Sequence, residues 1–161
     1  MNLRIRSGQL RDVQELAELK EISARRAYAF AAPEDLDAWL AARGGTAPLR
    51  RRIQDPDGGL IVAVDETGAL AGMVVVRVDD DVAHLGDLYC RHDGMGVGSV
   101  LYNVAKERAR ERGVHRIVAH CFRDNIRAQR FFVARGWRIV KSVEPSDRLG
   151  TSMLDELELR T

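Results

Sequence analysis

Three glycines at alternate positions, Gly94, Gly96 and Gly98, follow an apolar segment and precede a stretch with helical periodicity. Glycine lets the backbone turn tightly and approach a ligand closely, and the free N–H groups at the start of a helix attract anions. The spacing therefore indicates a turn that can hold phosphate. It is neither the dinucleotide fingerprint GxGxxG nor a P-loop, which needs Gly-Lys-Ser/Thr, and taken alone it is also compatible with a plain tight connection.

The segments on either side of the glycines predict the elements that position them. Residues 82–90 read as a strand that leads directly into the turn, and residues 99–112 carry apolar side chains on one helical face that ends at Gly113. Upstream, the apolar runs 60–64 and 70–78 are separated by a polar turn, which predicts a β-hairpin. The glycine turn is thus a strand-to-helix connection.

The rest of the chain extends this pattern in both directions. Before the hairpin it predicts a strand at 3–6, a helix that follows Asp12 and continues to about Ile22, and a helix from Pro33 to near Gly44. After the glycines it predicts a strand at 117–122, a helix at 125–135, and strands at 137–140 and 153–159. The order β-α-α-β-β-β-α-β-α-β-β predicts a single α+β domain over residues 1–161 with a mixed sheet.

Charge and hydropathy exclude several classes of partner. The chain has 25 basic and 24 acidic side chains, a formal net charge of +1, whereas a phosphate-reading nucleic-acid-binding protein usually has a basic excess. The run Arg50-Arg51-Arg52 is interpreted as a solvated stretch near a helix end. No apolar run approaches the roughly 20 residues that span a bilayer, and no signal-peptide pattern is present. We therefore expect a cytoplasmic protein that binds neither nucleic acid nor a membrane.

Two cysteines, Cys90 and Cys121, lie in apolar strand-like runs without CxxC spacing. This favours two buried, reduced thiols over a disulfide or a metal site. No metal is therefore expected.

The glycine turn lies within a longer series of motifs. Leu88-Tyr89-Cys90 precedes it, and the segment 125–132, NIRAQRFF, and then Gly136-Trp137 follow it. This series resembles the GCN5-related N-acetyltransferase (GNAT) family, which carries L-Y-V, R-G-x-G-x-G and N-x-x-A-x-x-F-Y-x-x-x-G-F in the same order and at about this separation. The resemblance covers residues 60–140 well, and the first 55 residues fit the variable two-helix entry of the family.

The resemblance implies a mixed, mostly antiparallel sheet flanked by helices, with a splay between the fourth and fifth strands. Acetyl-CoA would lie in this gap as the co-substrate. The residues implied to contact it are Leu88, Tyr89 and Cys90 at the pantetheine arm, the backbone of Gly94, Met95, Gly96, Val97, Gly98 and Ser99 at the pyrophosphate, and Asn125, Ala128 and Phe131 on its far side.

The implied reaction is transfer of an acetyl group to a primary amine of a small molecule or peptide, by direct attack and without a covalent enzyme intermediate. In the family, the region of the first two helices forms one wall of the acceptor pocket. Tyr28 and Phe30 are therefore the predicted substrate contacts, whereas Trp39 is at least as well explained as a core residue. Members of the family often dimerise through their terminal strands, so a homodimer is among the expected assemblies.

The attacking amine must be neutral, so the resemblance also implies a proton acceptor. Counting back from the family motifs to the positions where relatives carry a glutamate gives His84 and His120, with His120 favoured because its strand is otherwise apolar. An imidazole with an unperturbed pKa of about 6.5 suits a base near neutrality. Asp87, three residues after His84, ranks third because strand alternation would place it on the opposite face.

Three departures from the family pattern bear on activity. Asp93 replaces the motif arginine next to the expected pyrophosphate, the loop before the glycines is short, and Phe132 replaces a tyrosine that protonates the leaving thiolate in many members. Arg91 or His92 is the candidate for the missing positive charge. These departures keep open an alternative, a catalytically weak acyl-CoA-binding sensor, and a plain structural α+β domain is the second alternative.

Overall fold

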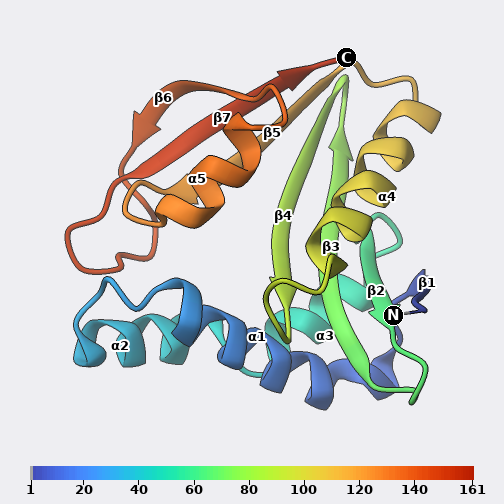
Figure 1. Cartoon of the computed structure of the whole chain (residues 1–161), viewed down its shortest axis with the longest axis horizontal. Coiled ribbons are helices and arrows are strands. Elements are labelled where there is room, and N and C mark those ends of the chain that lie inside the picture. Colours follow the sequence, from blue (N-terminus) through green and yellow to red (C-terminus); the bar gives the residue numbers. More distant parts are fainter. Residues whose placement is uncertain (1) are drawn as a thin grey trace.

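The computed structural model describes residues 2–161, which form a seven-stranded sheet (Figure 1). The strands follow the order β1-β2-β3-β4-β5-β7-β6, and every neighbouring pair is antiparallel except β4 and β5, which are parallel. Their bounds are β1 Arg4–Ser7, β2 Leu60–Val64, β3 Leu70–Asp79, β4 Val82–Cys90, β5 Arg116–Phe122, β6 Arg138–Val143 and β7 Leu154–Arg160. The predicted mixed, mostly antiparallel sheet is confirmed.

Helices cover both faces of this sheet. On one face, α4 (Val97–Glu111) and α5 (Ile126–Val133) enclose a core that includes Leu101, Ile117 and Leu157. On the other face, α1 (Val13–Ala27) and α3 (Ala47–Gln54) pack against β2 and β3. Next to them, α2 (Pro33–Arg43) packs against the end of β5.

The short helix α3 and the 3-10 turn η1 (Leu10–Asp12) were not predicted from the sequence. In α3, Leu49 and Ile53 are one turn apart and pack against the residues of α1, while Arg51 and Arg52 lie in its last turn, where basic side chains favour a helix end. The arginine run therefore lies near a helix end, as predicted, with Arg50 and Arg51 exposed. Two apolar positions are too weak a pattern to reveal a helix whose stability comes from tertiary packing.

The predicted splay between the fourth and fifth strands is confirmed by the register. β4 and β5 pair only from Val82 opposite Arg116 to Leu85 opposite Ala119. Beyond this point β4 stays paired with β3, and β5 stays paired with β7 as far as Phe122. The two strands diverge there, as Figure 1 shows, and within the described residues the peptide groups on their facing edges have no strand partner.

A β-bulge shapes β4 within the splay. Met73 of β3 pairs with Tyr89, but Val75, two residues on, pairs with Gly86, so β4 carries one extra residue here. Asp87 lies in this extra stretch with a φ of 48°, in the left-handed region that non-glycine residues seldom adopt. The bulge bends β4 and redirects its side chains.

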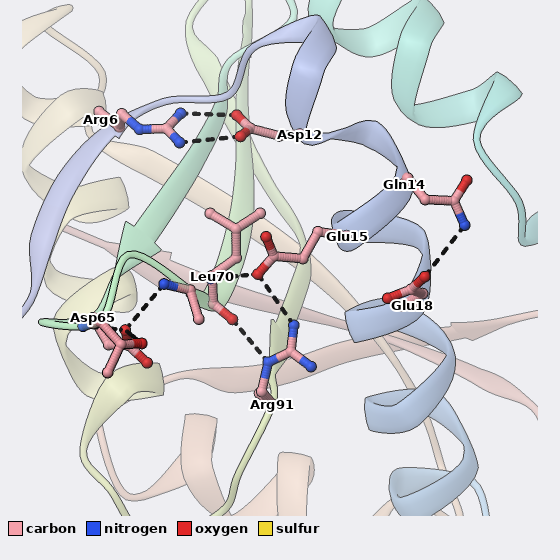
Figure 2. A network of polar contacts seen from close by, with 10 residues as sticks. Arg6, Asp12, Gln14, Glu15, Glu18, Asp65, Leu70 and Arg91 are labelled. Carbon is pink, nitrogen blue, oxygen red and sulfur yellow. Dashed lines mark hydrogen bonds and ion pairs between the residues drawn. The ribbon is translucent and has the colours of Figure 1, made fainter.

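Polar contacts fix the start of α1 to the sheet (Figure 2). The guanidinium of Arg6 donates to both carboxylate oxygens of buried Asp12, at 2.8 and 3.0 Å. The N–H of Leu70 donates to Oε2 of Glu15 at 2.6 Å. These contacts hold α1 against the strands, and α1 in turn brings its C-terminal residues to the splay.

Candidate functional site

A cavity of about 1060 Å³ lies where β4 and β5 separate. The glycine turn and the start of α5 line one end of it, and the α1–α2 connection and the β6–β7 loop line the other. The structure brings together almost all of the site residues predicted from the sequence: Tyr28, Phe30, His84, Leu88, Tyr89, Cys90, Gly94, Met95, Gly96, Val97, Gly98, Ser99, His120, Asn125, Ala128 and Phe131 line this cavity.

The glycine turn has the geometry of an anion site. Gly94 and Gly96 adopt φ values of 75° and 77°, which glycine tolerates without strain, and Gly96 is the N-cap of α4. The first N–H groups of a helix have no intrahelical acceptor and carry a partial positive charge. The turn therefore presents backbone donors to the cavity.

Asp93, at the head of this turn, is neutralised by two arginines. Nε of Arg26, at the end of α1, lies 2.8 Å from Oδ2 of Asp93, and Nη1 of Arg127, on α5, contacts the same oxygen. Arg26 also donates to the carbonyl oxygens of Cys90 and Arg91, at 2.8 and 2.9 Å. The loop between β4 and the glycines is thus folded around a guanidinium that comes from α1.

Arg91, a predicted cofactor contact, binds β3 and α1 instead. Its Nε donates to the carbonyl oxygen of Leu70 at 3.0 Å, and its Nη2 lies 3.4 Å from Oε2 of Glu15 (Figure 2). It is not among the residues that line the cavity, whereas His92 is. The tether to β3 and α1 therefore contradicts the expectation that the Arg91 side chain meets a phosphate, and Arg26 places a positive charge closer to the turn.

The α5 side of the cavity is built around a helix cap and an aromatic cluster. Oδ1 of Asn125 accepts from the N–H of Ala128 at 3.3 Å, which caps α5. The guanidinium of Arg135 lies 3.6 Å from the ring centroid of Phe131 and donates to Oγ of Ser99 at 2.9 Å. This contact ties the end of α5 to the first turn of α4.

Phe132, where many relatives have a tyrosine, is buried. Its ring lies 4.9 Å from that of Trp137 and 5.5 Å from that of Phe131, and it belongs to the core. It supplies no proton donor to the cavity, as the sequence predicts.

The opposite end of the cavity is aromatic. The ring of Tyr28 makes edge contacts with Phe30, Trp39 and Phe122, at centroid distances of 6.0, 5.1 and 5.4 Å. Trp39 is 5% exposed and belongs to the core, but it also borders the cavity. Tyr28 thus reaches from α1 to β5 across the splay, and this end offers an apolar wall to a ligand.

Two phenols stay protonated at this end. Burial raises the pKa of Tyr28 to about 12, and burial raises the pKa of Tyr89 well above its usual value, with the neighbouring Tyr28 adding to the effect. Both phenols are therefore in the neutral form at pH 7.

The two predicted histidines lie on the same face of the sheet. Ala83 and Leu85 pack into the core beneath α4, so alternation places His84 on the other face, towards α1. His84 pairs with Val118, and His120 is two residues further along β5 on that same face. Burial, helped by the charge of Arg77, lowers the pKa of His84, so its imidazole is neutral at pH 7.

Glu156 is a neighbour of His120 that sequence reasoning missed. Its Oε1 lies 3.2 Å from Nε2 of His120, and the two residues are directly opposite each other on β7 and β5. The pairing between these strands is not readable from local periodicity, so no sequence signal identified this carboxylate. It can hold the imidazole in one orientation.

The placement of Asp87 corrects the sequence-based prediction. Simple alternation would place it opposite His84, but the bulge adds a residue and reverses the phase of the strand. Its charge acts on Lys20, Tyr28 and Tyr89, all on the α1 side, and it lines the cavity with His84. Asp87 therefore belongs to the same face as the histidines.

The thiols are poor nucleophiles. Burial raises the pKa of Cys121 to about 12 and also raises the pKa of Cys90, and both cysteines are free. Cys121 is buried as predicted, whereas Cys90 is only half-buried and borders the cavity. Since the thiolate is the nucleophilic form, neither residue is prepared for a covalent intermediate.

Residues 2–161 contain neither a membrane-spanning helix nor a metal-binding cluster. No helix in this part of the chain is long and apolar enough to cross a membrane. Within the same residues, no group of three or more His, Cys, Asp or Glu side chains is placed to hold a metal ion.

Comparison with known proteins gives a consistent result. Residues 15–137 match the model of the acetyltransferase (GNAT) family. The PaiA N-acetyltransferase of Thermoplasma acidophilum, in complex with coenzyme A, is similar at a TM-score of 0.84 and 18% identity, with 100% of both chains covered. Ard1 of Thermoplasma volcanium is similar at a TM-score of 0.76 and 17% identity, covering 100% of this chain and 99% of the other.

A third similar structure is the ribosomal-protein-S18-alanine N-acetyltransferase of Escherichia coli, at a TM-score of 0.75 and 14% identity, covering 99% of this chain and 94% of the other. At identities this low, the TM-scores show a shared fold alone. No curated protein sequence gave a significant match.

Proposed function

Because the chain belongs to the acetyltransferase (GNAT) family, we propose that it transfers the acetyl group of acetyl-CoA to a primary amine of a small molecule or peptide. The acyltransferase class and the acyl-CoA co-substrate follow from the family. The acceptor class and the roles of individual residues are our proposal.

One observation carries it: the cavity at the splay of β4 and β5 is lined both by the glycine turn and by the two histidines. This cavity suits a long ligand with an anionic head. Backbone donors of the turn suit phosphate groups, and the unpaired edges of β4 and β5 suit the amides of a pantetheine arm. In this assignment Leu88, Tyr89 and Cys90 lie beside the arm, and Ala128 and Phe131 lie on its far side.

The acceptor amine enters beside Tyr28 and Phe30. His120, held by Glu156, accepts the proton that the ammonium form must lose before it attacks, and His84 is the second acceptor on this face. Acetyl-CoA supplies an activated thioester carbonyl. The neutral amine forms a C–N bond to that carbonyl carbon, and the C–S bond breaks. The attacking nitrogen releases one proton to give the neutral amide, and the sulfur leaves as a thiolate that takes up a proton.

A sensor that binds acyl-CoA without turnover is the second candidate function. Phe132 favours it, because the buried ring cannot protonate the leaving thiolate. General acid catalysis typically contributes about 10²–10⁴-fold, so its loss can leave a slow enzyme.

The two candidates are separated by measuring thiol release from acetyl-CoA with a panel of amines, in parallel with calorimetric titration of coenzyme A. The panel contains small monoamines, diamines, amino acids and short peptides with free N-termini. Amine-dependent thiol release supports the transferase. Binding of coenzyme A with no release for any amine supports the sensor, and absence of binding contradicts both.

A further inference from the structure

Asp93 links two elements across the cofactor end of the cavity. It stands at the head of the glycine turn, and its Oδ2 is shared by Arg26 of α1 and Arg127 of α5. All three residues border the cavity. A carboxylate beside a phosphate-binding turn is unfavourable for an anion unless its charge is compensated or removed.

The two arginines are not equivalent. Arg26 is committed to the protein, since it donates to the carbonyl oxygens of Cys90 and Arg91 as well as to Asp93. The Arg127 side chain is 70% exposed, and within residues 2–161 its contact with Asp93 is the only ion pair or side-chain hydrogen bond found for it. Arg127 can therefore leave its partner without disturbing the loop.

We propose that Arg127 is a phosphate ligand of coenzyme A, which Asp93 holds at the mouth of the cavity until a cofactor phosphate displaces the carboxylate. This inference rests on the proposed function. In the exchange, Arg26 keeps Asp93 and the loop in place, and Arg127 moves from a carboxylate to a phosphate group, for which its planar fork is well suited.

The exchange is favourable for an electrostatic reason. An exposed arginine–carboxylate pair contributes little to stability, because water screens it and two long side chains must be ordered. A cofactor phosphate held by the amides of the glycine turn carries more negative charge than the Asp93 carboxylate. Its contact with Arg127 is also less exposed to water than the Arg127–Asp93 pair. Asp93, left with Arg26 alone, still has a counter-ion.

The test uses isothermal titration of the full-length protein with coenzyme A and with dephospho-CoA. Arg127→Ala should weaken coenzyme A binding on the order of tenfold. Asp93→Asn, which keeps an acceptor for Arg26, should tighten binding by about threefold, because it frees Arg127 and removes a like charge. Arg130→Ala is the matched control, because Arg130 is an exposed arginine of α5 that does not line the cavity. Thermal melts check that each variant is folded.

Dephospho-CoA locates the phosphate. Loss of the Arg127→Ala effect with this ligand identifies the 3′-phosphate as the partner, and an unchanged effect identifies the diphosphate; both results support the proposal. Arg127→Ala binding coenzyme A as tightly as Arg130→Ala, or Asp93→Asn binding no more tightly than the unsubstituted protein, overturns it. Failure of the unsubstituted protein to bind coenzyme A would instead refute the proposed function.

Discussion

Nε2 of His120 lies 3.2 Å from Oε1 of Glu156, across the antiparallel pair of β5 and β7. The carboxylate is the more buried partner, with 14% of its side chain exposed against 38% for the imidazole. Because Glu156 occupies one ring nitrogen, Nδ1 is the atom left to take a proton from a ligand. The pairing of β5 with β7 thereby lets Glu156 orient the His120 side chain at the splay.

His120→Gln should lower kcat on the order of 10²-fold while the Kd for coenzyme A stays unchanged, because the change removes a proton acceptor but no cofactor contact. Steady-state kinetics and titration measure the two effects separately. His115→Gln is the control, since His115 is exposed and lies outside the cavity. Normal turnover of the His120 variant would reject His120 as the base.

Glu156→Gln should reduce kcat about tenfold, less than the loss of His120 itself, with little change in the KM for acetyl-CoA. The amide still fills the space but provides a weaker, neutral partner for the imidazole. Combining this change with His120→Gln should add nothing further, because a positioning residue acts only through the group that it positions. Additive losses in the double variant would show that Glu156 acts independently.

Cys121→Ser should retain amine-dependent turnover. With a pKa of about 12 the thiol is protonated at neutral pH, and direct attack needs no acyl-cysteine. Mass spectrometry after incubation with acetyl-CoA alone should find no acetylated protein. A stable acetyl adduct on this residue, together with lost turnover in the variant, would instead indicate a two-step route.

Asp12→Asn should lower the free energy of unfolding by about 1–3 kcal/mol at pH 7, because the amide keeps only one of the two acceptor oxygens that Arg6 binds and removes the negative charge. The Arg6 hydrogen bonds lower the pKa of Asp12 below its unfolded value of about 3.9. Its stabilisation is therefore present above that value and lost as the pH falls through the lower folded pKa.

Urea unfolding at pH 7 and at pH 2 measures this difference, which should shrink at the lower pH. Glu21→Gln is the control, since the Glu21–Arg25 pair is exposed and its loss should not change stability measurably. A destabilisation by Asp12→Asn that persisted at low pH would mean that packing, not charge, holds the start of α1.

Local patterns were sufficient for most elements of the fold, and the resemblance to the GNAT family supplied the predicted cofactor end of the site. Apolar runs and alternation identified the strands, spacing of three and four identified the longer helices, and Gly94 and Gly96 marked the strand-to-helix turn. These features depend on neighbours a few residues apart, which is why they are readable in the chain. The short α3 was not predicted, because its two apolar positions are stabilised only by packing against α1.

The partnerships inside the site were decided by tertiary structure alone. The bulge in β4 places Asp87 on the same face as His84, whereas simple alternation would place it on the opposite face. One extra residue in the strand reverses the two-residue alternation. The pairing of β5 with β7 placed Glu156 beside His120, and the packing of α1 and α5 on opposite faces of the sheet brought Arg26 and Arg127 to Asp93. The sequence by itself determined the residue types and the local elements; their partners follow from contacts between segments far apart in the chain, which only the folded sheet creates.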